Sequence, residues 1–321
     1  MEKIEIMDIP GIRIGHAQDE EAATGCTVVI CEKGATAGVD VRGGSPGTRE
    51  TDALDPVNNR KEIHAVLLAG GSAFGLDAAG GVMRYLEERH VGRDVGVTCI
   101  PNVCGAILFD LKCGDYRIRP DAEMGYKACV NAGTVPLAEG SVGAGTGCTV
   151  GKILGQAFAM KGGIGTCAFR QGELLVGAVV AVNCVGDIYD RESGRIIAGV
   201  LRKGSSLPGN TEDIILSDYA SMTDFFSGNT VIGCVVTNAK LDKAKANKLA
   251  SVSQNGIARA VRPAHSIFDG DTVFTMCTGE TEANLDAVGI LSAYAVEQAI
   301  LRAVKHAESI CGYPAYKDLN K

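Results

Sequence analysis

Short apolar runs rich in β-branched residues alternate with segments of helical periodicity, and this alternation most constrains how the 321-residue chain can fold. Strands with an apolar face and helices with an apolar stripe must bury these surfaces against each other, which produces layers. Several of the predicted strands are expected to form antiparallel pairs, and long helical segments flank them. The pattern therefore predicts an α/β layered chain, with sheets between helix layers, in one domain over residues 1–321.

Apolar periodicity and turn residues place the expected elements along the chain. Strands are expected as two short strands within 4–31 joined by a turn at Gly15-His16-Ala17, at Ile63–Ala69, as two segments of 95–111 divided at Pro101, as two strands within 154–187 including Leu174–Cys184, at Val231–Val236 and at Thr272–Cys277. Helices are expected over Phe74–Glu88, around Ala122–Ala132, over Leu241–Asn255 with a stop at Gly256, and over Glu282–Ser309. Residues 188–229 are polar and rich in turn formers, which predicts a mobile connection.

Composition excludes several classes of function. The net charge is −7, whereas nucleic acids and anionic membranes attract basic faces, so neither is expected as a partner. None of the twelve cysteines form a CxxC pair and most lie within apolar runs, so no zinc cluster and no other cofactor is expected. The charged N-terminus and the polar breaks within every apolar segment predict a soluble, cytoplasmic protein whose cysteines are reduced core residues.

The residues Gly228-Asn229-Thr230 form a turn that opens directly into the run Val231–Val236. A threonine at a chain N-terminus carries its own base, because its α-amino group can accept the hydroxyl proton. Cleavage between Asn229 and Thr230, by attack of the threonine hydroxyl on the preceding carbonyl, would create such a residue. The long polar segment before the turn would permit this cleavage, and the strand after it would hold the nucleophile rigidly.

A conventional triad has little support in this chain. It needs a histidine base, and of the five histidines only His265 lies in a suggestive place, shortly before two aspartates. A histidine there is more often part of a structural turn. A cysteine nucleophile is possible on composition, but no cysteine stands in an obviously basic surrounding that would lower its pKa.

Other polar residues have both a structural and a functional interpretation. The glycine-dense stretch 141–152 lacks the spacing of a phosphate-binding loop, which leaves Lys152 as an ordinary surface lysine or a site residue. Asn183, at the end of a buried strand, is a structural amide or a site residue. Asp269 and Asp271 flank a glycine, so they form a plain turn or hold the amine or hydroxyl of Thr230. Residues 42–52 form a loop that is either merely solvated or in contact with substrate.

Long motifs in a fixed order resemble the β-peptidyl aminopeptidase / L-aminopeptidase–D-amidase family, which includes nylon-oligomer hydrolases. The resemblance covers almost the whole chain. Its motifs are Gly15-His16, the run from Ser45 to Thr51, the run from Gly70 to Asp77, Gly228-Asn229-Thr230, the run from Arg259 to His265, and the run from Asp269 to Phe274.

The resemblance implies an α-β-β-α four-layer sandwich that is similar to N-terminal-nucleophile hydrolases and to ornithine acetyltransferases. It also implies a precursor that cleaves itself before Thr230 into chains 1–229 and 230–321, which remain together. Lys152 then matches a family active-site lysine, and Asn183 matches an asparagine that binds the oxyanion. Asp269 and Asp271 match an acidic pair beside the nucleophile. By the same resemblance the protein forms a homo-oligomer, a tetramer of the cleaved pairs.

The resemblance implies an aminopeptidase that acts on small peptides or amides, of the β-, D- or oligoamide type. Some relatives use a tyrosine hydroxyl near the site, and Phe109 falls in the corresponding region here, so that role is not transferred. An acyltransferase of the ornithine acetyltransferase type is the alternative, because one acyl-enzyme can pass its acyl group to an amine or to water. An uncleaved member of the family with a binding role is a second alternative.

Overall fold

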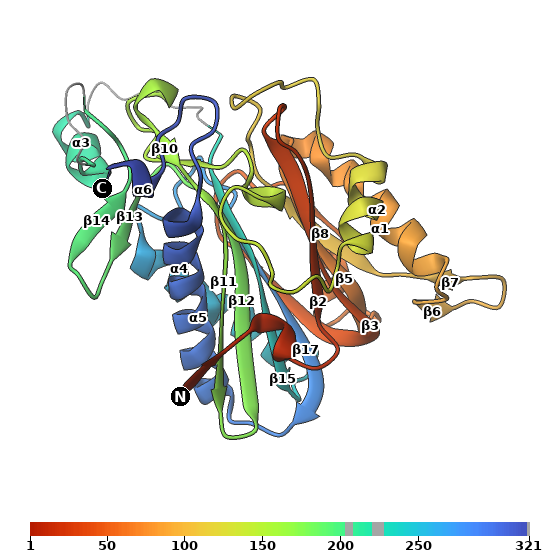
Figure 1. Cartoon of the computed structure of the whole chain (residues 1–321). Coiled ribbons are helices and arrows are strands. Elements are labelled where there is room, and N and C mark those ends of the chain that lie inside the picture. Colours follow the sequence, from red (N-terminus) through yellow and green to blue (C-terminus); the bar gives the residue numbers. More distant parts are fainter. Residues whose placement is uncertain (203–207, 220–227, 320–321) are drawn as a thin grey trace.

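The computed structural model describes residues 1–202, 208–219 and 228–319. Two β layers pack face to face, and each carries helices on its outer side (Figure 1). Helices α4 and α5 cover the layer that contains β11, β12, β15 and β17, while α1 and α2 cover the layer that contains β2, β5 and β8. The predicted α-β-β-α sandwich is therefore confirmed.

The bounds of the elements follow from the backbone hydrogen bonds. The described strands are β1 (Glu2–Ile4), β2 (Arg13–Asp19), β3 (Thr24–Val41), β4 (Thr48–Arg49), β5 (Ile63–Ala69), β6 (Arg93–Asp94), β7 (Cys99–Ile100), β8 (Val103–Ile107), β9 (Thr149–Val150), β10 (Met160–Lys161), β11 (Gly163–Gln171), β12 (Leu174–Asn183), β13 (Asp187–Asp190), β14 (Arg195–Ala198), β15 (Thr230–Ala239), β16 (Val261–Arg262) and β17 (Thr272–Thr281). The described helices are α1 (Ala78–Glu87), α2 (Ala122–Val130), α3 (Thr211–Ser217), α4 (Lys243–Ala260), α5 (Leu285–His306) and α6 (Tyr316–Leu319), with short 3-10 turns η1 (Ile6–Asp8), η2 (Thr51–Leu54), η3 (Ser72–Asp77), η4 (Gly143–Gly145) and η5 (Gln156–Phe158).

The long strand β3 joins the two layers. Its first part, 24–30, pairs with β2 and β5 in one layer, and its last part, 36–41, pairs with β17 in the other. One hydrogen-bonded path therefore runs through both layers, in the order β1-β11-β12-β15-β17-β3-β5-β8-β4. Neighbours are antiparallel except for β15 with β17 and β5 with β8, and helices α4 and α1 provide these two parallel crossovers.

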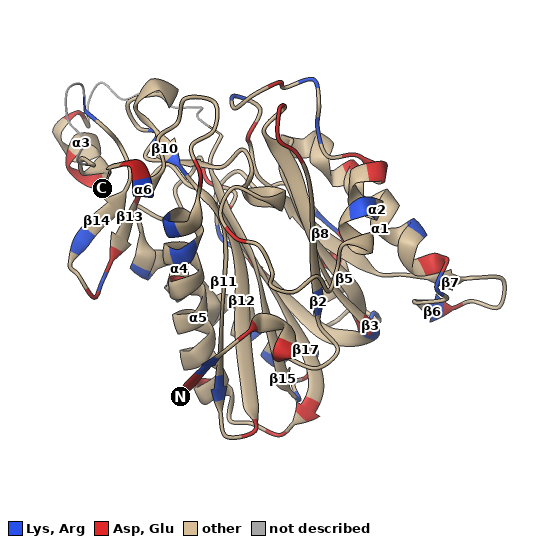
Figure 2. Ribbon diagram, viewed as in Figure 1, with Lys and Arg blue, Asp and Glu red and all other residues tan. Residues whose placement is uncertain are grey.

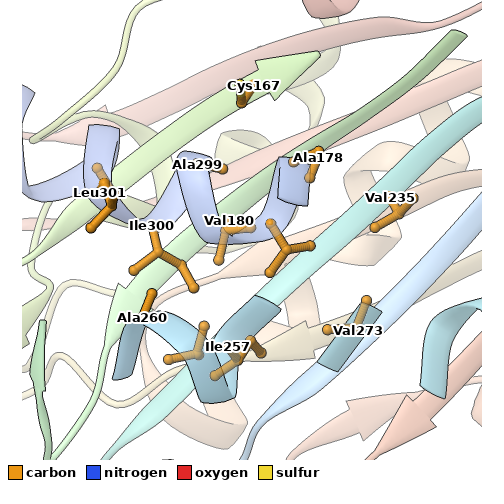
Figure 3. Packing of buried hydrophobic residues seen from close by; sticks show 14 of the residues in the cluster. Cys167, Ala178, Val180, Val235, Ile257, Ala260, Val273, Ala299, Ile300 and Leu301 are labelled. Carbon is orange, nitrogen blue, oxygen red and sulfur yellow. The ribbon is translucent and has the colours of Figure 1, made fainter. Parts of the chain in front are cut away.

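Three apolar cores lie between the four layers. The core between the sheets includes Leu68, Ile232 and Phe274, all fully buried. The core beneath α4 and α5 is seen in Figure 3, where Ile257 and Ile300 pack over strand residues such as Val180. A third core lies beneath α1 and α2. Because each sheet is buried on both faces, its strands carry nearly continuous apolar sequence, and charged residues concentrate on the helices, turns and loops (Figure 2).

Two glycines that seemed to end elements serve close packing instead. The predicted turn at Gly15-His16-Ala17 is wrong, because these residues lie within β2, where a Cβ on Gly15 would come within 2.2 Å of the Ala128 carbonyl oxygen of α2. The predicted stop at Gly256 is also wrong. Helix α4 continues to Ala260, and a Cβ at position 256 would meet the Ala293 carbonyl oxygen of α5 at 2.4 Å.

The other predicted elements largely hold. Strand β5 has the predicted bounds, and two segments, β7 and β8, flank Pro101 as expected. The helix expected from Phe74 begins instead as the 3-10 turn η3, and α1 starts only at Ala78. Helix α5 is shorter at both ends than the predicted helix over 282–309.

The segment 188–229 is more ordered than the sequence predicted, in the part that is described. It contains most of the hairpin β13–β14 and the helix α3. The buried carboxylate of Asp187 accepts hydrogen bonds from the Val200 amide and from both the amide and the hydroxyl of Thr211, which ties hairpin and helix together. Residues 203–207 and 220–227 of this segment lie outside the described residues.

Helix α5 is long and apolar enough to cross a membrane by length and composition, with a mean hydropathy of 1.3 over its best window. Its sequence nevertheless contains the expected polar breaks, among them Glu297, Gln298 and Arg302. In addition, 72% of that window is buried against the sheet and α4, as expected of a core helix.

We predict that Phe274→Ala lowers the free energy of unfolding by about 3–5 kcal/mol, because it empties a fully buried site between the two sheets. Urea unfolding monitored by circular dichroism measures the change. Phe74→Ala is the matched control, since the Phe74 side chain is 58% exposed and its truncation should cost far less. Equal losses in the two variants would contradict the packing described.

Candidate active site

The residues predicted to form the site come together at one end of the sheet. Thr230 begins β15 and lies directly opposite Asn183, the last residue of β12. Asp269 and Asp271 immediately precede β17, the parallel neighbour of β15, and Lys152 follows β9. All five side chains are at most 3% exposed, so the sheet buries a cluster of polar and charged groups.

The Thr230 hydroxyl hydrogen-bonds to the carbonyl oxygen of Asn229, the residue directly before it. The same oxygen accepts a hydrogen bond of 3.1 Å from the Gly270 amide. A Cβ at position 270 would lie 2.9 Å from Thr230 Oγ1, so this residue must be small to leave room for the hydroxyl. The Asn229 carbonyl thus has a hydroxyl on one side and an amide donor on the other.

The two aspartates have different surroundings. Asp271 is fully engaged, since Oδ1 accepts from the Val231 amide at 2.7 Å and Oδ2 accepts from both the amide and Nδ1 of His265. Asp269 Oδ2 accepts from the amide and hydroxyl of Ser266, while its buried Oδ1 has no hydrogen-bond partner among the described residues. Burial, and then the charge of Asp271, raise the pKa of Asp269.

Lys152 is completely buried, so its interpretation as an ordinary surface lysine is wrong. Its ammonium group donates to the carbonyl oxygen of Asn183 at 2.7 Å, to Asn183 Oδ1 at 3.0 Å and to the Gly228 carbonyl at 3.3 Å. Desolvation lowers the pKa of Lys152 to about 8, because burial disfavours the charged form. A lysine in this state is partly neutral near pH 8 and can accept as well as donate a proton.

Asn183 connects the groups around it. Its Nδ2 donates to the Phe109 carbonyl at 2.9 Å and to the Gly228 carbonyl at 3.3 Å, while its Oδ1 accepts from the Thr149 amide at 2.9 Å. The Gly228 carbonyl oxygen therefore accepts from both the Lys152 ammonium and the Asn183 amide. Two side-chain donors converge on one oxygen, as in sites that stabilise an oxyanion.

Gly228 has a left-handed backbone with φ of +61°, which favours glycine. A Cβ at this position would come within 2.3 Å of the Phe109 ring. Phe109 therefore packs closely against the chain just before Asn229, and it also supplies the carbonyl that orients Asn183. From the sequence, Phe109 was noted only because it falls where some relatives use a tyrosine hydroxyl, and its contact with Gly228 was not predicted.

The loop after β3 lies against the acidic turn. The amides of Arg42 and Gly43 donate to the Asp271 carbonyl, and the Ser45 amide donates to the Asp269 carbonyl at 2.8 Å. Part of the loop over residues 42–52 thus borders the site. The glycine turn at 70–72, by contrast, is a tight corner, where the Gly71 amide donates to the buried Asp110 carboxylate at 2.6 Å.

Sequence reasoning missed three groups that the structure adds to the site: the Gly270 amide, Ser266 and the contact of His265 with Asp271. The short spacing of His265 and Ser266 from the aspartates was a usable signal, but it did not show which atoms meet. Among the described residues, no group of three or more histidine, cysteine, aspartate or glutamate side chains could hold a metal ion. A cavity of about 510 Å³ between β2 and α2 includes none of the site residues.

Two solved structures have the same overall fold as this chain. A β-aminopeptidase from Burkholderia sp. superposes with a TM-score of 0.70 at 21% identity, over 98% of this chain and 92% of its own. An L-aminopeptidase D-Ala-esterase/amidase from Ochrobactrum anthropi, described as a new variant of the Ntn hydrolase fold, gives 0.70 at 20% identity, over 95% and 87% of the two chains.

Sequence comparison identifies the family. An uncharacterized aminopeptidase of Mycobacterium leprae is 41% identical over 97% of this chain and 92% of its own length. A 6-aminohexanoate-oligomer endohydrolase of Paenarthrobacter ureafaciens is 29% identical over 93% of this chain and 85% of its own. The pattern of peptidase family S58 matches residues 5–317. The chain therefore belongs to peptidase family S58 and is a peptidase or amidohydrolase.

Proposed function

We propose that this peptidase is made as a precursor, cleaves its own bond between Asn229 and Thr230, and then hydrolyses amides with Thr230 as an N-terminal nucleophile. The observation that carries the proposal is the pairing of the Thr230 hydroxyl with the Asn229 carbonyl, whose oxygen also accepts from the Gly270 amide. A nucleophile and an oxyanion donor thus meet at one peptide bond inside a buried site.

In self-cleavage the Thr230 hydroxyl oxygen attacks the Asn229 carbonyl carbon, and the Gly270 amide binds the oxyanion that forms. Neutral Lys152 takes the hydroxyl proton, which fits its lowered pKa and its contact with Asn183, the cross-strand neighbour of Thr230. The C–N bond then breaks, the Thr230 nitrogen gains a proton, and an ester remains. Water hydrolyses the ester to give an Asn229 carboxylate and a free Thr230 hydroxyl.

In turnover the new α-amino group of Thr230 is the base for its own hydroxyl. The Asp269 Oδ1 atom, which has no hydrogen-bond partner among the described residues, is suited to hold this amino group when it is protonated. The substrate carbonyl oxygen takes the place that the Gly228 carbonyl fills in the precursor, between Lys152 Nζ and Asn183 Nδ2. The acyl group passes to Thr230, the amine leaves, and water releases the acid.

Activation requires the end of the first fragment to move. In the uncleaved chain the Gly228 carbonyl accepts hydrogen bonds from Lys152 Nζ and Asn183 Nδ2. Residues 228–229 must therefore move away after cleavage before a substrate carbonyl can bind to these two donors. The fragments 1–229 and 230–321 stay packed together, because β12 of the first pairs with β15 of the second along eight residue positions. A complete site needs both fragments.

Small peptides and amides are the proposed substrates, and relatives named as aminopeptidases and as an oligoamide endohydrolase support this class. An acyltransferase would use the same acyl-enzyme, but membership of a peptidase family favours water as the acceptor. The five buried site residues argue against an uncleaved binding role. We also propose, from the resemblance alone, a cytoplasmic tetramer of cleaved pairs.

Purified protein should run as two fragments on a denaturing gel, and N-terminal sequencing of the smaller one should begin at Thr230. Thr230→Ala should give one full-length folded chain, because it removes the attacking hydroxyl, whereas Thr230→Ser should still cleave. Efficient cleavage of the alanine variant would assign the reaction to another nucleophile.

Self-cleavage should become faster as pH rises through about 8, because Lys152 accepts the proton only in its neutral form. Cell-free synthesis followed by a chase at pH 6 to 10 measures the rate. The α-amino group of Thr230 does not exist before cleavage, so its titration cannot contribute to the pH profile.

Lys152→Met should slow cleavage about 10²- to 10⁴-fold and abolish the rise of the rate with pH. Lys161→Met is the matched control, since Lys161 is equally buried and its ammonium group donates, among the described residues, to the carbonyls of Gly145 and Cys148 and to no site residue. A flat profile for the unaltered chain would contradict the role of Lys152.

Gly228→Ala should slow self-cleavage at least about tenfold, because the new Cβ collides with Phe109 and displaces the carbonyl next to the scissile bond. Gly172→Ala is the control for backbone strain, since Gly172 has nearly the same φ of +59° and an added Cβ there would meet no described atom within 4 Å. The time course on denaturing gels distinguishes the variants. Unaltered cleavage of Gly228→Ala would mean that this carbonyl does not position the bond.

A further inference from the structure

His265 contacts the acidic pair from the turn that precedes β17. Its amide donates to Asp271 Oδ2 at 3.0 Å, and its Nδ1 lies 2.8 Å from the same oxygen. The histidine has a left-handed backbone with φ of +57°, which is uncommon outside glycine. Strained residues of this kind persist where the surrounding structure fixes them, and they gather at functional sites.

The proton of this contact can be assigned from the chemistry of the pair. An ionised carboxylate is only an acceptor, so Nδ1 must carry the proton that it donates to Asp271. The other ring nitrogen, Nε2, is buried and has no hydrogen-bond partner among the described residues. The neutral Nδ1–H tautomer leaves Nε2 without a proton, and it requires no second donor contact.

Asp271 links His265 to the segment that carries Thr230. Asp271 Oδ1 accepts from the Val231 amide at 2.7 Å, and Val231 is bonded to Thr230. The carbonyl of Asp271 is held independently by the amides of Arg42 and Gly43. His265 supplies two donors to Oδ2, its amide and its ring, so without the ring this oxygen loses one of the two bonds that fix the plane of the carboxylate.

We propose that His265 is a positioning residue, whose Nδ1–H holds Asp271 in the orientation that fixes the start of β15 and thereby the Thr230 hydroxyl. This inference rests on the proposed nucleophilic role of Thr230. It assigns no proton transfer to His265, because the ring reaches the nucleophile only through Asp271 and the Val231 amide.

Three substitutions at this position separate the ring donor from the backbone strain. His265→Asn keeps an N–H donor near the place of Nδ1 and tolerates the left-handed backbone. His265→Ala removes the donor and keeps the strain, and His265→Gly removes both. Each variant is purified as the full chain, and kcat and KM are measured with the chromogenic p-nitroanilides of alanine and β-alanine, together with the rate of self-cleavage and the unfolding midpoint.

We expect His265→Ala and His265→Gly to lower kcat by about 10- to 100-fold with KM changed less than about threefold, the range typical when an orienting partner is removed. His265→Asn should recover most of kcat. The inference is overturned if all three variants keep the original kcat, if the asparagine variant loses as much as alanine, or if glycine restores activity, since the last result would make backbone strain the cause.

A measurement without turnover separates this inference from the proposed function. In the Thr230→Ala chain, long-range ¹H–¹⁵N correlation of labelled histidines should show His265 as the Nδ1–H tautomer, and Asp271→Asn should change that spectrum. A ring in the Nε2–H form would overturn the inference even if the enzyme cleaves itself as proposed. If the unaltered chain neither cleaves at 229–230 nor hydrolyses amides while the Nδ1–H tautomer is present, the proposed function fails and the contact of His265 with Asp271 stands.

Discussion

The pairing of β12 with β15 is the constraint on which the site depends. It sets Asn183 directly opposite Thr230, so the end of one strand faces the start of the next. The parallel partner β17 begins beside Ile232 and brings the aspartate turn to the same level. Because both strands are buried between a helix layer and the second sheet, the positions of these groups are fixed by the packing of the whole domain.

Burial of charge gives the site its chemistry. Lys152, Asp269 and Asp271 are removed from water at the end of the sheet, and hydrogen bonds hold each of them. The charges of Lys152 and Asp269 favour each other, whereas the charge of Asp271 opposes that of Asp269. The same desolvation lowers the pKa of the lysine and raises that of Asp269, which brings both values closer to neutral pH. Asp271 differs from Asp269 because three donors hold its two carboxylate oxygens. These contacts suit Asp271 for anchoring the start of β15.

Strand periodicity predicted the layers, because it is a local signal, and the family resemblance of the ordered motifs named residues that the structure brings together at one end of the sheet. The sequence did not predict that Lys152 is buried, since a lysine at the end of a glycine-rich loop carries no local sign of what covers it. The sequence also suggested that Gly15 forms a turn and that Gly256 ends a helix. In the structure each glycine instead lets the backbone of a neighbouring helix approach closely. The contacts of His265, Ser266 and the Gly270 amide depend on the path of one turn in three dimensions, which residue spacing does not specify.

Trapping the acyl-enzyme identifies the nucleophile itself. The purified protein is incubated with a slowly hydrolysed activated ester of alanine, quenched in acid and digested, and the acyl group is located by peptide mass spectrometry. We expect one adduct, on the peptide that begins with Thr230 as a free N-terminus. An acyl group on a cysteine, a serine or any other residue, with Thr230 unmodified and still bonded to Asn229, would contradict it.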